Sequence, residues 1–67
     1  MIASVNTNHG RRTAEFATMG AAAEFIVDTV RGIYGPIADG VRVTGEGLRG
    51  EVIDMTTGER VGSWHLR

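Results

Sequence analysis

Apolar residues recur at helical spacing from Met19 to Ile33 and form one stripe along that segment. Thr18 is suited to cap the first turn, because its hydroxyl can accept a hydrogen bond from a free backbone N–H. Gly35 and Pro36 follow as a stop signal, since glycine can adopt a left-handed conformation and proline cannot continue a helix. The pattern therefore predicts a helix over residues 19–33. Its apolar stripe consists of Met19, Ala22, Ala23, Ile26, Val30 and Ile33.

Alternation of apolar and polar residues predicts strands after this helix. Val41–Thr44 has the pattern of a half-buried strand, and glycines at positions 45 and 47 interrupt it. Two longer runs follow, Leu48–Met55 and Glu59–Leu66, joined by the turn residues 56–58. A three-residue turn ending in glycine is a common hairpin connection. The C-terminal part of the chain is therefore predicted to be a three-stranded antiparallel meander.

The predicted turn sets the register of the second hairpin, because it places Met55 opposite Glu59. In the same register Trp64 lies opposite Gly50, where the indole can cover backbone that carries no side chain. The remaining predicted pairs are Asp54–Arg60, Ile53–Val61, Val52–Gly62 and Leu48–Leu66.

The first eighteen residues allow two interpretations. One is a hairpin that turns at residues 8–10, another three-residue turn ending in glycine. The other extends the helix back through Arg11, because residues 12–17 include good helix formers. Phe16 alternates correctly for a strand, whereas Ala14 and Ala17 fall off the stripe of the helix, so the hairpin is favoured. The hairpin would pair Ile2 with Phe16 and Ser4 with Ala14.

These elements predict a single α+β domain with the element order ββαβββ, in which one central helix packs on an antiparallel sheet. A chain of 67 residues buries only ~60% of the surface that it exposes when unfolded. Proteins of this size commonly gain stability from disulfides, metals or oligomerisation. Since the chain has no Cys, self-association is the expected support, and we predict a homodimer.

The predicted C-terminal sheet carries apolar side chains on both faces. One face holds the larger set and is expected to pack on the helix; its members are Leu48, Val52, Trp64 and Leu66. The other face mixes apolar and polar side chains, which suits contact with a second subunit or with another protein. The predicted protein interface consists of Ile53, Met55, Val61 and His65.

The composition bears on the source and the partners of the chain. All seven basic residues are Arg, and Lys and Gln are absent, which is typical of a gene from a GC-rich bacterium or one of its bacteriophages. The net charge of −1 argues against strong, sequence-independent attraction to nucleic acid or to anionic membranes. The chain shows no basic, apolar leader and no membrane-spanning run. Together with the lack of Cys, this predicts a cytoplasmic protein without membrane contact.

No constellation of side chains indicates catalysis, a metal site or a cofactor. Ser63 and His65 are two residues apart on one predicted strand, so their side chains lie on the same face and point the same way. A nucleophile and its base must instead converge. The two imidazoles, His9 and His65, lie near opposite ends of the sequence, without a metal-ligand spacing. We therefore expect a protein that is not an enzyme.

Two binding functions remain, and they belong to different classes. The first is a protein-interaction module that binds itself and an unidentified protein, such as a host factor for a phage product. The alternative is a nucleic-acid-binding accessory protein that uses Arg11, Arg12, Arg42 and Arg49 to reach phosphates. Neighbouring carboxylates nearly balance Arg42 and Arg49 on the predicted strands, which favours the first function.

Overall fold

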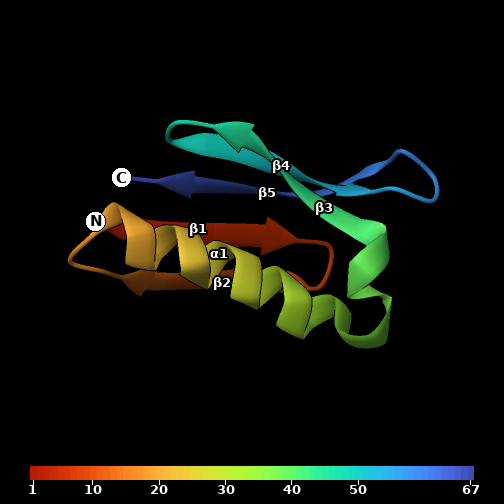
Figure 1. Cartoon of the computed structure of the whole chain (residues 1–67), viewed down its shortest axis with the longest axis horizontal. Coiled ribbons are helices and arrows are strands. Elements are labelled where there is room, and N and C mark those ends of the chain that lie inside the picture. The colour runs from red at the N-terminus through yellow and green to blue at the C-terminus, as the bar shows by residue number, and fades with distance from the viewer.

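The computed structural model describes all 67 residues and confirms the predicted ββαβββ order of an α+β domain (Figure 1). Five strands form one antiparallel sheet in the spatial order β2-β1-β5-β4-β3. The elements are β1 (Ile2–Thr7), β2 (Gly10–Glu15), α1 (Met19–Tyr34), the 3-10 helix η1 (Gly35–Gly40), β3 (Val41–Glu46), β4 (Arg49–Asp54) and β5 (Arg60–Leu66).

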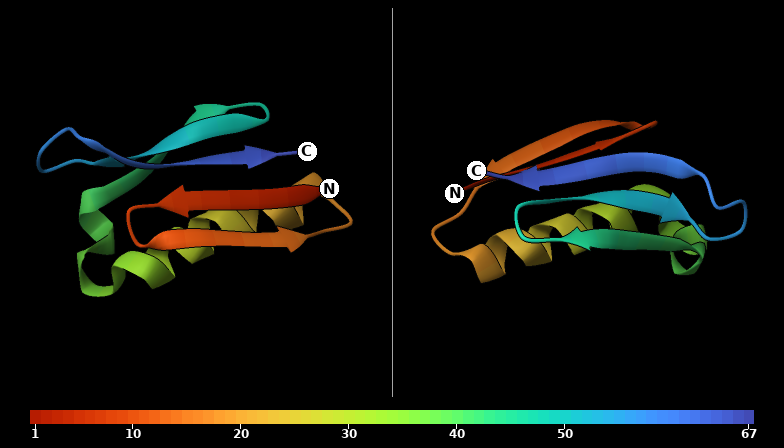
Figure 2. Two further views of the ribbon diagram at one scale, coloured as in Figure 1. Left: turned by 180° about the vertical axis from the view of Figure 1, so that it is seen from behind. Right: turned by 90° about the horizontal axis from the view of Figure 1, so that it is seen from above.

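The helix α1 covers only part of one side of the sheet. It lies mainly on β1 and beside β2, while β3 and β4 stand on the other side of an open strip (Figures 1 and 2). The sheet curls so that β3 comes forward on the same side as α1 (Figure 2). We call this the helix side of the sheet, and the opposite side the outer side. The buried apolar residues are Ala3, Val5, Ala22, Ile26, Val30, Tyr34, Val52 and Leu66.

The predicted boundaries of α1 are confirmed to within one residue. The Thr18 hydroxyl accepts a hydrogen bond from the Ala21 backbone N–H, as a helix N-cap does. At the other end, Gly35 adopts φ 53° and its N–H donates to the Arg31 carbonyl, a geometry that favours glycine. The η1 turn that follows was not predicted. It delivers the chain from the end of α1 to the start of β3.

The N-terminal hairpin is confirmed, but its predicted register is wrong by one residue. Thr7 pairs with Gly10, so the turn contains only residues 8 and 9. The Thr7 hydroxyl accepts the His9 N–H, which stabilises this tighter turn. A shift of one residue reverses the side that a strand presents. It places Ala14 opposite Ala3 on the helix side; Ile2 pairs with Glu15 and Ser4 with Thr13.

The second hairpin keeps the predicted register along most of its length and loses it near the turn. The pairs Gly50–Trp64 and Val52–Gly62 are confirmed. Nearer the turn a bulge makes Ile53 pair with Arg60 instead of Val61, and the Asp54 N–H bonds to the Glu59 carbonyl. The predicted pairs Met55–Glu59, Asp54–Arg60 and Ile53–Val61 are therefore wrong. The turn is one residue longer than predicted, and the extra residue at the bulge restores the register.

The predicted cover of Gly50 by the Trp64 ring is confirmed. The indole N–H donates to the Thr44 carbonyl oxygen at 2.8 Å, so Trp64 on β5 reaches across β4 to β3. A Cβ on residue 50 would overlap both the indole and that carbonyl oxygen. Strand β3 also continues through Gly45 to Glu46, where the sequence predicts a break.

The side chain of Tyr34 joins the end of α1 to the β1–β2 turn. Its hydroxyl donates to the Asn8 side-chain oxygen at 3.1 Å, and its ring meets that of His9 edge-on, with 5.4 Å between centroids. Burial raises the pKa of the Tyr34 phenol above its ordinary value of 10.0.

This pKa predicts a loss of stability in alkaline solution. The folded chain holds the phenol proton more tightly than the unfolded chain does, so the free energy of unfolding is unaffected by Tyr34 below pH ~10 and falls as the pH rises through the raised pKa. The chain has no Lys and no Cys, so between pH 9 and 12 Tyr34 is the one side chain that titrates.

Urea denaturation at pH 8 and pH 11 should show this fall in the free energy of unfolding in the wild type. In Tyr34→Phe this fall with pH should be absent. The variant should instead be less stable than the wild type by about 1 kcal/mol at both pH values, because it lacks the hydrogen bond. A Tyr34→Phe variant with the wild-type fall would refute this assignment.

Candidate functional site

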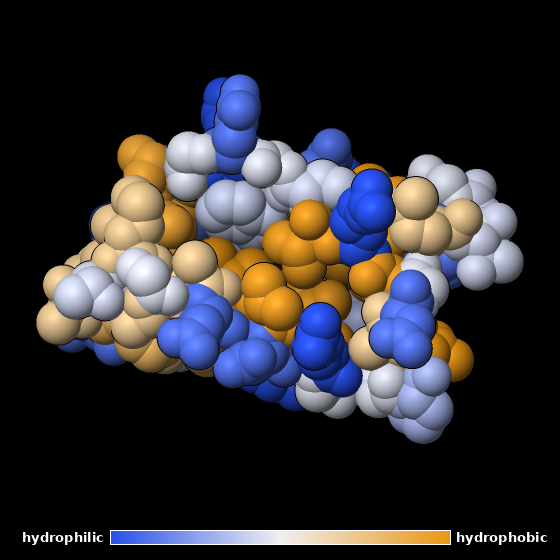
Figure 3. All heavy atoms as spheres, viewed as in Figure 1, coloured by the Kyte–Doolittle hydropathy of each residue, from blue (hydrophilic) through white to orange (hydrophobic).

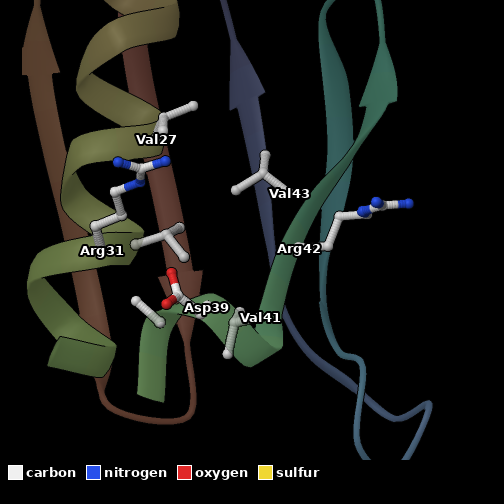
Figure 4. A pocket seen from close by; sticks show the side chains of 8 residues that line it. Val27, Arg31, Asp39, Val41, Arg42 and Val43 are labelled. Atoms are coloured by element: carbon white, nitrogen blue, oxygen red, sulfur yellow. The ribbon is translucent and has the colours of Figure 1, made fainter. Parts of the chain in front are cut away.

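An apolar groove separates α1 from β3 on the helix side of the sheet (Figure 4). Its walls are Val27 and Val30 on the helix and Val41 and Val43 on the strand, and it encloses about 320 Å³. Ala38 of η1 contributes to the same cavity. The helix and the strand thus face each other across a gap that no other element fills.

The apolar surface continues toward the start of α1. A second cavity of about 180 Å³ shares Val27 and Val43 with the first, so the two form one strip. Its other apolar lining residues are Met19, Ala23, Ile26, Trp64 and Leu66. Figure 3 shows hydrophobic atoms gathered between α1 and β3, with hydrophilic side chains bordering them. We name the whole strip the α1–β3 groove.

Two helix residues in this groove are unusually exposed for their size. Met19 is 50% exposed and Val27 is 41% exposed. Both line the cavity that also contains Val43 of β3 and Trp64 of β5. Leu48, which was predicted to pack on the helix, is 54% exposed in the β3–β4 turn, so that prediction is wrong. Large apolar side chains that gather around an open groove are typical of contact surfaces.

Charged side chains border the groove without pairing across it. Arg31 of α1 and Asp39 of η1 both line its edge (Figure 4). The one ion pair in the structure lies elsewhere, between Arg60 and Glu51. The groove therefore has an apolar floor and a polar rim, the general anatomy of a protein–protein interface.

The structure does not bring the four predicted interface residues together. Ile53 and His65 lie on the outer side, where Ile53 pairs with Arg60 and His65 with Arg49. Met55 is exposed in the β4–β5 turn. Val61 lies at the bulge and packs against the core, so its predicted position on the outer face is wrong. The predicted outer face is consequently more polar than the sequence suggests.

The predicted nucleic-acid residues are also divided between the two sides. Arg11, Arg42 and Arg49 fall on the outer side by strand alternation, whereas Arg12 lines a hollow beside α1. Carboxylates accompany the outer arginines: Glu46 lies opposite Arg49 in the β3–β4 register, and the Glu51 carboxylate accepts a hydrogen bond from Arg60 at 3.3 Å. Trp64, the single indole of the chain, is directed to the helix side. The outer side thus offers mixed charge without an aromatic platform.

A shallow hollow on the outer side contains Ser63 and His65, the pair considered above as a nucleophile and its base. Arg49, Glu51, Arg60, Ser63 and His65 line about 580 Å³ between β4 and β5. The Ser63 and His65 side chains make no hydrogen bond to each other, nor does a carboxylate orient His65. No three His, Asp or Glu side chains lie close enough to share a metal ion. The hollow has none of the convergent geometry of an acyl-transfer site.

Sequence reasoning missed the α1–β3 groove, although one signal was available. Val27 is a large apolar residue that lies outside the stripe formed by Ile26 and Val30. An apolar residue off the buried stripe of a helix points to a second contact surface. Comparison of this chain with protein-family models, with curated proteins and with solved structures found no match. No helix of the structure is long and apolar enough to cross a bilayer.

Proposed function

We propose that this chain is a small cytoplasmic protein-interaction module that works as a homodimer and uses the α1–β3 groove as its contact surface. The observation that carries this proposal is the exposed, continuous apolar strip between Val27 and Val43, which lines both cavities of the groove. Burial of such a strip against a partner is favourable, because apolar surface leaves water.

The size of the chain supports this use of the groove. A specific interface covers roughly 800 Å² on each subunit, and the whole chain exposes 4393 Å². An interface of ordinary size would therefore occupy a large share of one side of the molecule. The groove gathers the exposed apolar side chains of Met19 and Val27 with Val43 on one side of the molecule, whereas the outer side interleaves arginines and carboxylates.

Substitution of Val27 by Asp tests this proposal. The side chain is 41% exposed, so the subunit should still fold, but a carboxylate in the apolar contact would be buried without a partner. Such a buried charge costs about 2–5 kcal/mol, so the dissociation constant of the dimer should rise at least about 30-fold. Sedimentation equilibrium or light scattering over a range of concentrations measures this change.

Met55→Asp is the matched control. Met55 is 53% exposed and belongs to the interface that the sequence predicts, but it lies outside the groove. The proposal expects Met55→Asp to remain dimeric. If Met55→Asp dissociates and Val27→Asp does not, the contact surface is the turn and not the groove. A wild-type chain that stays monomeric at millimolar concentration would refute the homodimer itself.

A further inference from the structure

The strand β3 bears unused hydrogen-bonding capacity at the margin of the α1–β3 groove. It is an end strand with β4 as its single neighbour. The Thr44 carbonyl oxygen is directed toward β4, where Gly50 lies against it and Trp64 donates to it. Neighbouring residues of a strand direct their backbone groups to opposite sides. The N–H and C=O of Val43 are therefore directed away from β4, to the free edge.

We propose that two copies of the chain join through antiparallel pairing of β3 with β3, about a two-fold axis at Thr44, so that one sheet runs through both subunits. This inference rests on the proposed homodimer and names its geometry. In that register Val43 of each copy lies opposite Gly45 of the other, and Arg42 of each lies opposite Glu46 of the other. The two α1–β3 grooves then lie on the same side of the joined sheet.

Charge complementarity selects this register. Arg42 and Glu46 make no ion pair within the chain, and they lie on the outer side at alternate positions of one strand, with Thr44 between them. Antiparallel pairing centred on Thr44 brings each guanidinium opposite a carboxylate of the other copy, twice per dimer. Opposite charges in directly paired positions stabilise a sheet, and like charges in those positions destabilise it.

The other end strand, β2, is the competing edge. It offers the same charge spacing, since Arg11 and Glu15 flank Thr13 as Arg42 and Glu46 flank Thr44. On its helix side, however, β2 presents Arg12 and Ala14, beside a hollow lined by Thr29 and Gly32. A charge at an inward position of an edge strand opposes the addition of another strand. β3 instead presents Val41 and Val43, which line the groove.

Pairing through β3 also places the strand wall of the groove beside the new contact. Val43 faces the groove on the helix side and directs its backbone to the free edge, so a strand added there carries its own Val43 and Val41 on the same side of the sheet. The edge alone would bury too little surface for a stable dimer. Edge and groove together supply both backbone hydrogen bonds and apolar contact.

Charge reversal at the two positions tests the proposed register. Arg42→Glu and Glu46→Arg each replace two attractive pairs by two repulsive ones, so each should weaken the homodimer at least about tenfold. An equimolar mixture of the two variants should form a heterodimer with complementary pairs, and the double variant R42E/E46R should dimerise like the wild type. The matched control reverses the β2 charges: R11E and E15R should leave the dissociation constant unchanged. Sedimentation velocity with one labelled component measures all of these.

A cross-link gives a second, independent measurement. Paired residues whose backbone groups face away from each other have Cα atoms about 4.5 Å apart, within the roughly 4.4–6.8 Å that a disulfide spans. The chain has no Cys, so Thr44→Cys under oxidised glutathione should give one product, a covalent dimer, whereas Thr13→Cys on β2 should not.

The outcomes distinguish the homodimer from its proposed geometry. If the charge variants remain dimeric and Thr44→Cys fails to cross-link while Val27→Asp dissociates, the homodimer stands and the β3 pairing is wrong. A monomeric wild type overturns both.

Discussion

Replacement of Gly50 by Ala is expected to lower the free energy of unfolding by about 3 kcal/mol or more. A Cβ at this position of β4 would overlap the Thr44 carbonyl oxygen, which is backbone and cannot rotate away, and also the indole of Trp64. To make room, β3 would have to separate from β4, and Trp64 would have to move off Gly50 and lose its hydrogen bond to Thr44. A chain of this length has a total stability of only about 3–10 kcal/mol, so this one methyl group should unfold a large fraction of the protein.

Gly32→Ala is the matched control, because it makes the same chemical change where there is space. No heavy atom lies within 4 Å of a Cβ at position 32 of α1, and Ala is preferred to Gly inside a helix by about 0.5–1 kcal/mol. Gly32→Ala should therefore stabilise the chain slightly. Urea denaturation followed by the fluorescence of the single Trp compares the two variants. Equal stability of Gly50→Ala and the wild type would show that Trp64 does not pack on Gly50.

The elements of this fold were predictable because each has a local signal. Thr18 and Gly35 mark the ends of α1, and its apolar period distinguishes it from the alternating strands. The contact of Trp64 with Gly50 was predictable for a similar reason, since the two are paired through a single hairpin. Signals of this kind depend on residues near each other in the sequence, where turn geometry limits the possible strand registers.

The errors in register arose where two turn lengths fit the same residues. Residues 8–10 and 56–58 both end in glycine, and both were assigned to three-residue turns. The Thr7 hydroxyl shortens the first turn by bonding the His9 N–H. In the second, the Asp54 carboxylate accepts the Thr56 N–H and the Gly58 N–H bonds to the Asp54 carbonyl, so the turn begins earlier. Side-chain hydrogen bonds of about 1 kcal/mol decided both cases.

The candidate site was not predictable, because it depends on which strands the helix covers. The sequence shows that α1 is amphipathic but not that it packs mainly on β1 and makes few contacts with β3. That choice follows from pairing of β1 with β5, which joins the two hairpins across most of the chain length. Once this pairing places β3 at the end of the sheet, Val27, Val41 and Val43 become a groove.

Truncation to Ala at two adjacent residues of α1 should affect different properties: the stability of the subunit at Ile26 and the affinity of the dimer at Val27. Ile26 is buried in the core and Val27 is 41% exposed in the groove. Ile26→Ala should cost about 2–5 kcal/mol, because it removes transfer free energy and leaves a cavity. Val27→Ala should cost the isolated subunit less than about 1 kcal/mol, yet it should weaken the dimer, since the lost methyl groups belong to the contact surface.

Protein concentration separates the two effects. Dimerisation stabilises the folded state by mass action, so the urea midpoint of a dimeric chain rises with concentration. Ile26→Ala should show a low midpoint already at low concentration, whereas Val27→Ala should show a nearly normal midpoint there and a smaller rise with concentration than the wild type. Urea titrations at about 1 and 100 times the dimer dissociation constant measure both quantities. If Val27→Ala destabilised the chain as much as Ile26→Ala at low concentration, Val27 would be a core residue of the single subunit, and the groove would lose the side chain that connects its two cavities.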